Sequence, residues 1–105
     1  MTTIRFSRSH GRLSGFTCQG HSGYAACGED IVCAAVTSAI RLLECTMNDV
    51  LKTGAECSVD EEGTRITLKL PSSPQKEAED LLKGMLLYMQ ELQSEYPEHL
   101  TVLEV

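Results

Sequence analysis

The chain has 105 residues, a formal net charge of -6 and a sequence pI near 4.9. This length predicts a single domain over residues 1–105 with a modest core, and the acidic balance argues against direct nucleic-acid binding, which needs a basic face. The N-terminus lacks a signal-peptide core and no apolar run approaches the ~20 residues that span a bilayer, so we expect a cytoplasmic protein without a membrane segment.

The first part of the chain predicts a β-hairpin. Residues Thr2 to Arg8 alternate, with Ile4 and Phe6 on one face, as in a half-buried strand. A polar turn leads to a second strand from Leu13 to Gln19, and its change of parity near Gly15 indicates a bulge. This hairpin ends where the most unusual stretch of the sequence begins.

Residues 20–33 read Gly-His-Ser-Gly-Tyr-Ala-Ala-Cys-Gly-Glu-Asp-Ile-Val-Cys and carry the chemistry of a site. The three glycines predict a loop shaped for movement or close approach: Gly20, Gly23 and Gly28. We expect Cys33 in the first turn of the next helix, where unpaired N–H groups and the helix dipole favour a thiolate. Cys33 and His21 are therefore a candidate pair of nucleophile and general base. Backbone N–H groups near Cys33 would donate hydrogen bonds to the oxyanion that forms when a thiolate attacks a carbonyl.

A helix is predicted from Asp30 to about Leu51, because apolar residues recur there at intervals of three and four. Its expected buried stripe consists of Val32, Val36, Ala39, Leu43, Met47 and Val50. Lys52 and Gly54 supply the usual stop signals.

The rest of the chain repeats this order. Two strands at 55–59 and 64–70 form a second hairpin, and a helix begins with Ser73 as N-cap and Pro74 at its first position. A last strand covers 100–105. The predicted order is β-β-α-β-β-α-β, which favours a two-layer α+β domain with one sheet and two helices. Apolar residues beside the main stripe of the second helix suggest cover by another subunit: Leu86, Leu87 and Tyr88.

Other interpretations of the cysteines and histidine stay open from the residues alone. A structural zinc site would use Cys18, His21, Cys27 and Cys33, but gaps of two, five and five residues fit zinc poorly. A buried, purely structural Cys33 is a further alternative. The chain is also compatible with a non-catalytic binding module, or with a redox protein that pairs Cys27 with Cys33.

The segments Gly20 to Ala25 and Gly28 to Thr37 resemble the signature of the bacterial ribosomal-processing cysteine protease family, Prp. The resemblance covers essentially the whole chain. It implies a homodimeric cysteine protease, without a cofactor, that removes the N-terminal extension of a large-subunit ribosomal protein. The motif histidine and cysteine, His21 and Cys33, would be the catalytic pair.

Four further residues of the motif region are candidates to orient the histidine or to shape the substrate cleft: Ser22, Tyr24, Asp30 and Thr37. Ser22 lacks the Gly-x-Ser-x-Gly elbow of a hydrolase nucleophile. Thr37 stands where the family more often has serine, a change that keeps the hydroxyl.

Overall fold

A computed structural model describes residues 1–20, 27–60, 62 and 64–105, with residues 27–30 described by their backbone alone. A single mixed sheet forms one layer, with strand order β3-β4-β2-β1-β5. Its strands are β1 (Thr2–Ser9), β2 (Arg12–Gln19), β3 (Glu56–Asp60), β4 (Arg65–Lys69) and β5 (Leu100–Glu104). Neighbouring strands are antiparallel except β1 and β5, which are parallel.

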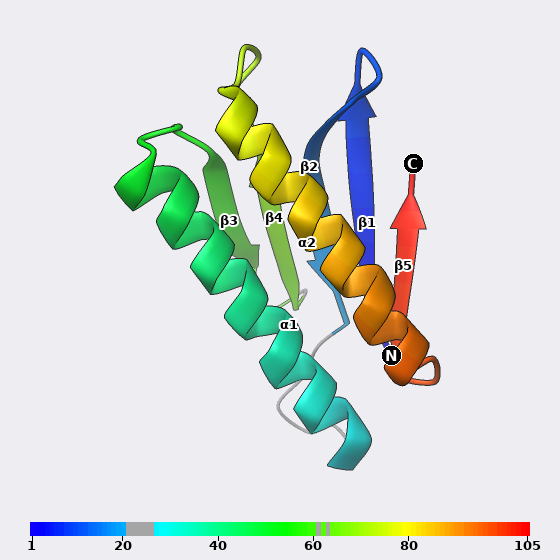
Figure 1. Ribbon diagram of the computed structural model, residues 1–105. Coiled ribbons are helices and arrows are strands. Elements are labelled where there is room, and N and C mark those ends of the chain that lie inside the picture. Colours follow the sequence, from blue (N-terminus) through cyan, green and yellow to red (C-terminus); the bar gives the residue numbers. More distant parts are fainter. Residues whose placement is uncertain (21–26, 61, 63) are drawn as a thin grey trace.

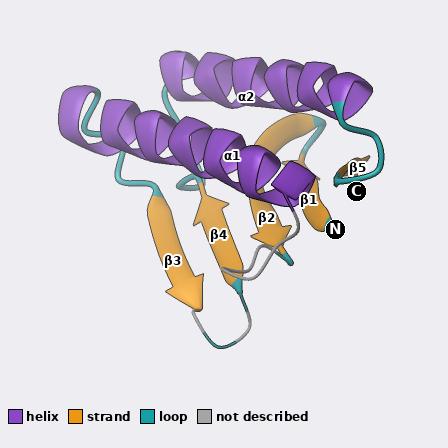
Figure 2. Ribbon diagram, turned by 90° about the horizontal axis from the view of Figure 1, so that it is seen from below, coloured by secondary structure: helices purple, strands orange, loops and turns teal. Residues whose placement is uncertain are grey.

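Helices α1 (Cys27–Cys45) and α2 (Lys76–Glu95) run side by side across one face of this sheet (Figures 1 and 2). The two-layer α+β arrangement and its β-β-α-β-β-α-β order are therefore confirmed. The N-terminal part of α1 reaches the end of the sheet where β1 begins (Figure 1). This end of the sheet is where the candidate site lies.

A bulge in β2 lies beside Gly15, as the sequence predicts. The register between β1 and β2 shifts at one point and leaves Ser14 as the extra residue. The Ser14 carbonyl accepts a 2.8 Å hydrogen bond from the N–H of Leu70. A Cβ at Gly15 would collide with the carbonyl oxygen of Leu68, so glycine lets β4 approach β2 closely.

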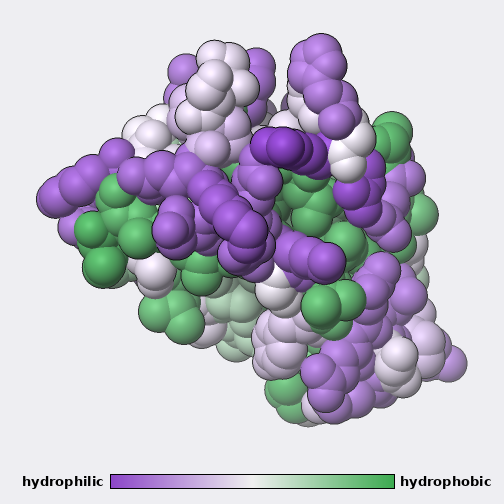
Figure 3. All heavy atoms as spheres, turned by 45° about the horizontal axis from the view of Figure 1, so that its top comes forward, coloured by the Kyte–Doolittle hydropathy of each residue, from purple (hydrophilic) through white to green (hydrophobic). Residues whose placement is uncertain are grey.

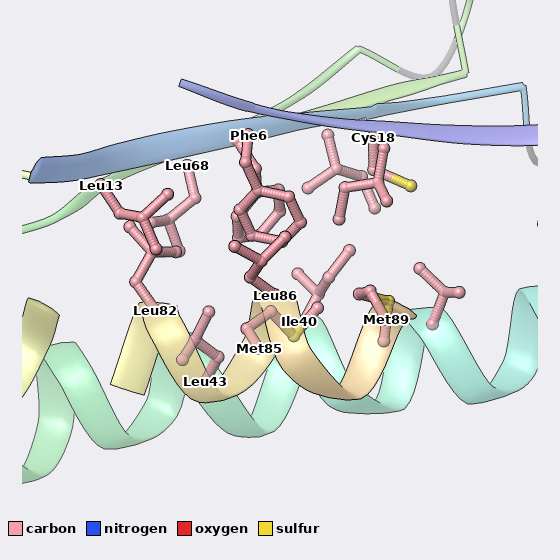
Figure 4. Packing of buried hydrophobic residues seen from close by; sticks show 14 of the residues in the cluster. Phe6, Leu13, Cys18, Ile40, Leu43, Leu68, Leu82, Met85, Leu86 and Met89 are labelled. Carbon is pink, nitrogen blue, oxygen red and sulfur yellow. The ribbon is translucent and has the colours of Figure 1, made fainter. Parts of the chain in front are cut away.

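The core fills the space between the sheet and the helices. Phe6 and Phe16, whose ring centroids are 5.6 Å apart, lie at its centre. Figure 4 shows side chains of the sheet, including Cys18, pointing toward those of α1 and α2. Three methionines of the helical segments are core residues, and the sequence predicted the first of them in the buried stripe: Met47, Met85 and Met89.

The first helix differs from the prediction at its C-terminal end. After α1 the chain continues as a π-helical turn, η1 (Thr46–Val50), with the N–H of Leu51 bonded to the carbonyl of Thr46 at 2.9 Å. A π-turn is wider than an α-turn and shifts the following residues around the axis. Val50 is consequently 69% exposed rather than buried, while Ile40, which the predicted stripe omitted, is in the core.

The second helix begins at Lys76, so the prediction of Ser73 as N-cap and Pro74 as first helical residue is wrong. Gln75 is the N-cap residue, with an extended backbone. Its side-chain amide donates to the Leu51 carbonyl at 3.2 Å and accepts from the Thr53 hydroxyl at 2.9 Å. These two bonds attach the start of α2 to the segment that follows η1. A capping pattern reads only neighbouring residues and therefore does not predict such distant contacts.

Three apolar residues of α2 were expected beside its buried stripe. Leu86 is in fact buried in the core, whereas Leu87 and Tyr88 are exposed. The expectation of an apolar surface on α2 therefore holds for two of the three residues.

One apolar segment is longer than the sequence reading allowed. Residues Ile31–Val50 have a mean hydropathy of 1.3 over a helix long enough to cross a membrane, with 28% of that stretch buried. Core helices of soluble proteins pass the same test of length and composition, and Val32, Val36 and Ile40 pack against the sheet. The prediction that no apolar segment reaches the length of a membrane span is therefore wrong for Ile31–Val50, although this length and composition are only weak evidence for a span.

Candidate active site

Cys33 lies on α1 above the first residue of β1. Its side chain is half-buried, and its Sγ is 3.7 Å from the hydroxyl oxygen of Thr2, within hydrogen-bonding range for sulfur. Thr2 is buried, and its backbone N–H donates to the carbonyl of His99 at 3.0 Å. A helix and two neighbouring strands, β1 and β5, therefore fix the surroundings of the candidate nucleophile.

Cys18 is a second sulfur at this end of the sheet. It lies opposite Ile4 in the ladder of β1 and β2, on the face that the helices cover, and is completely buried. Burial, with a smaller contribution from the charge of Cys33, raises the pKa of the Cys18 thiol to about 12. Cys18 is therefore a neutral thiol near pH 7 and a poor nucleophile.

The position of Cys33 within its helix corrects one prediction. Because α1 begins at Cys27, Cys33 is in the second turn, about 9 Å along the axis from the helix start. The electrostatic effect of a helix end is concentrated in its first turn. A backbone N–H in the second turn is moreover bonded to the carbonyl four residues earlier, so the helix terminus is not the source of the favourable environment or oxyanion donors expected for Cys33.

Two motif residues occupy places other than those predicted. Gly28 belongs to α1 instead of a loop, and Asp30 is the fourth residue of α1 instead of its first. Glycine costs a helix only about 1 kcal/mol relative to alanine, while the acidic Glu29 and Asp30 are favoured throughout the first turn. These preferences explain why the helix extends beyond the predicted start.

Gly20 has an unusual backbone conformation at the end of β2. Its φ is 94°, a conformation that L side chains rarely adopt, and a Cβ there would collide with the carbonyl oxygen of Met1. Its N–H donates to the carbonyl of Thr64 at 3.2 Å. The chain thus leaves the described part at the same end of the sheet as Cys33.

Several predicted site residues lie outside the described residues: His21, Ser22, Gly23 and Tyr24. Thr37 is described; it is half-buried and lies one turn after Cys33 on the same side of α1. The structure thus brings Cys33 together with Thr2 and Cys18, neither of which the sequence reading assigned to a catalytic site.

A signal for Thr2 was present in the sequence. Thr2 has the same parity as Ile4 and Phe6, so it belongs to the buried face of β1. A hydroxyl at the buried end of an apolar strand needs a partner. The sequence did not identify this partner, which is Cys33 of α1.

The remaining described cysteines are less suited to nucleophilic chemistry. A hydrogen bond to Asp49 raises the pKa of the exposed Cys45 thiol. Burial and a hydrogen bond to Glu44 raise the pKa of Cys57 to about 11. Both thiols remain protonated at neutral pH, which disfavours a nucleophilic role for either residue.

The metal and redox alternatives can be compared with this geometry. Within the described part of the chain no three His, Cys, Asp or Glu side chains gather as metal ligands, while the side chains of His21 and Cys27 lie outside it. Cys27 and Cys33 both belong to α1, six residues or about 9 Å of helical rise apart. A disulfide needs Cα atoms within about 7 Å, so this helix holds the proposed redox pair apart.

Residues 1–101 match the family model described as cysteine protease Prp. The chain belongs to this family. It is 31% identical over 106 residues to the ribosomal processing cysteine protease Prp of Bacillus subtilis, covering 95% of this chain and 92% of the relative. The resemblance seen in the sequence motif is thereby confirmed, as is the class of enzyme, a cysteine protease.

Solved structures share the fold over the whole chain. The crystal structure of SMU.848 from Streptococcus mutans has a TM-score of 0.89 at 25% identity, covering 100% of this chain and 97% of the other. The ribosomal processing protease Prp from S. aureus, in complex with a substrate peptide, has a TM-score of 0.91 at 20% identity, with both chains fully covered. The Prp fold therefore extends over all the elements described above.

Proposed function

We propose that Cys33 is the nucleophile of this protease and that His21 is its general acid and base. The observation that carries the proposal is the position of Cys33: a half-buried sulfur next to a hydroxyl, at the end of the sheet from which the chain enters the motif histidine. The other described thiols are disfavoured as nucleophiles by their raised pKa values.

The proposed reaction has two steps. The Cys33 thiolate attacks the scissile carbonyl, and protonated His21 gives its proton to the leaving amine, which leaves a thioester on Cys33. His21 then takes a proton from water, whose oxygen attacks the thioester, and the C–S bond breaks to release the new carboxyl end. Cys33 leaves as a thiolate beside protonated His21, which restores the starting pair, and the new carboxylic acid gives its proton to the solvent. Proton and electron balance are complete without a cofactor.

We infer that the substrate is the N-terminal extension of a bacterial large-subunit ribosomal protein. The Bacillus subtilis relative is named as a ribosomal processing protease, and the S. aureus protein was crystallised with a substrate peptide. The charge of -6 also suits a basic partner such as a ribosomal protein. We place the activity in the cytoplasm, where thiols stay reduced.

The test is incubation with an N-terminally extended ribosomal protein, with the shortened product read out by mass spectrometry. We expect Cys33→Ala and His21→Ala each to reduce cleavage by roughly 10⁴-fold or more, because nucleophile and base act as a unit. Cys45→Ala makes the same change on the exposed side of α1 and should cleave normally. Residual cleavage by Cys33→Ala near the wild-type rate rejects the assignment, and a pull-down would then support the binding-module alternative.

We also propose that the chain works as a homodimer and that the outer groove between α1 and α2 contributes to the contact. This groove encloses about 490 Å³. Its walls are mainly apolar: Ala35, Ser38, Ala39, Leu42, Leu43, Thr46, Leu81, Met85 and Tyr88. Figure 3 shows exposed hydrophobic residues, in green, among the hydrophilic residues of the face that it draws. Exposed apolar surface of this kind favours burial against another chain.

Sedimentation velocity of two matched variants tests the dimer. Leu42 and Val50 are 70% and 69% exposed, but only Leu42 lines the groove. We expect Leu42→Glu to yield monomer at concentrations where Val50→Glu and the wild-type chain remain dimeric. Dimers of all three chains would place the contact elsewhere, and a monomeric wild-type chain would refute the dimer itself.

A further inference from the structure

We propose that Thr2 is a further residue of the active site, whose hydroxyl stabilises the Cys33 thiolate and fixes the direction of its sulfur. The inference rests on the proposed role of Cys33 as nucleophile. Thr2 Oγ1 and Cys33 Sγ are 3.7 Å apart. Either atom can donate while the thiol is protonated, but after ionisation only the hydroxyl can donate, so the bond favours the charged form.

The hydroxyl is held in place by the backbone of the sheet. Thr2 is 2% exposed, pairs with Leu100 of β5, and donates its N–H to His99. Threonine is also restricted at χ1 by its branched Cβ. The donor therefore needs little reorganisation when the thiolate forms, which is the arrangement that stabilises a developing charge most effectively.

Several titratable groups belong to residues near this contact. Glu29 and Asp30 precede Cys33 by four and three residues along α1. The Met1 α-amino group precedes Thr2, and His99 accepts the Thr2 N–H with its backbone carbonyl. Among the titratable groups that the structure describes, Cys18 of β2 interacts with Cys33, and burial keeps it neutral. Ile66 and Leu68, on the buried face of β4, are apolar, as are the core residues of α2. Arg5 of β1 has opposite parity to Thr2 and is exposed. His21, beyond the described residues, is the other group that the proposed function places beside the thiolate.

The experiment measures the rate of iodoacetamide modification of Cys33 against pH, by peptide mapping of the intact folded chain. In Thr2→Val, which keeps the shape and removes the hydroxyl, we expect iodoacetamide to modify Cys33 roughly tenfold more slowly near pH 7, because the thiolate loses its hydrogen-bond donor. Thr2→Ser, which keeps the hydroxyl, should restore the wild-type rate. Thr3→Val makes the same change on the opposite face of β1 and should leave the profile unaltered.

Each outcome decides the proposal. Coincident profiles for Thr2→Val and wild type overturn it, and so does an equal loss of rate in Thr2→Ser, since the lost methyl would then be responsible. If a thermal melt shows that Thr2→Val is unfolded, Thr2→Ala is compared with Thr2→Ser, because both lack the methyl and only one lacks the hydroxyl. The readout needs no cleavage, so failure of Cys33 as nucleophile in the cleavage assay is recognised separately.

Discussion

Replacing Gly20 with alanine tests how the chain is directed at the end of β2. Gly20 has a φ of 94°, and an added Cβ would collide with the carbonyl oxygen of Met1. The left-handed backbone costs a residue with a side chain about 1–2 kcal/mol. Displacing Met1 from the sheet end adds to this, and we expect Gly20→Ala to lower the free energy of unfolding by about 2–3 kcal/mol in total.

Two other glycines separate the contributions. Gly54 also has a positive φ, 78°, but a Cβ there meets no atom within 4 Å, so Gly54→Ala should cost only the backbone term of about 1–2 kcal/mol. Gly84 is inside α2 with free space around it. Gly84→Ala should stabilise the protein by about 0.5–1 kcal/mol, because alanine is the better helix former.

Urea denaturation of the three variants, monitored by circular dichroism, measures the differences. The expected ranking of stability is Gly84→Ala above wild type, then Gly54→Ala, then Gly20→Ala. Equal losses for Gly20→Ala and Gly54→Ala would mean that the close approach of Met1 is irrelevant. A destabilised Gly84→Ala would refute the helix argument.

Three further predictions follow from the cysteines. At neutral pH iodoacetamide should modify Cys33 before Cys18, Cys45 and Cys57, and peptide mapping that finds Cys45 or Cys57 labelled first would count against a tuned nucleophile. Cys18 has a native pKa of about 12 against ~8.5 when unfolded; the native state therefore binds more protons between these values, and stability should fall as pH rises through this window. The slope should be shallower in Cys18→Val, and equal slopes by chemical denaturation would contradict the assignment. Elemental analysis should find no stoichiometric zinc, and a chelator should leave the melting temperature unchanged; one zinc per chain, lost together with folding, would establish a structural metal site.

Periodicity was sufficient to predict most of the fold. The alternation of Ile4 and Phe6 and the three-and-four spacing of Val32 and Val36 reflect burial against one sheet face, which local sequence records directly. The errors concern the ends of helices, where contacts with residues distant in sequence determine the structure. Gln75 defines the start of α2 through bonds to Leu51 and Thr53, some twenty residues earlier.

The sequence motif was sufficient to predict Cys33 as a candidate site residue. It was not sufficient to predict the helix position and the contacts that surround Cys33. Cys33 was recognised from neighbouring residues, but the start of α1 was placed three residues late, which displaced Cys33 into a first turn it does not occupy. Its contact with Thr2 spans 31 residues of sequence. Such a contact depends on where α1 crosses the sheet, and no single segment of the sequence contains that information.

The start of β1 and the end of β2 support the candidate site together. Cys33 contacts Thr2 at the start of β1, and the chain enters the histidine motif through Gly20 at the end of β2. A Cβ at Gly20 would collide with the Met1 carbonyl oxygen and come within 3.8 Å of the Thr2 Cα. Gly20→Ala should therefore reduce peptide cleavage and also change the alkylation profile of Cys33, whereas Thr3→Val, on the opposite face of β1, should change neither. If Gly20→Ala reduced cleavage and left the alkylation profile of Cys33 at that of the wild type, the coupling inferred from these contacts would be wrong.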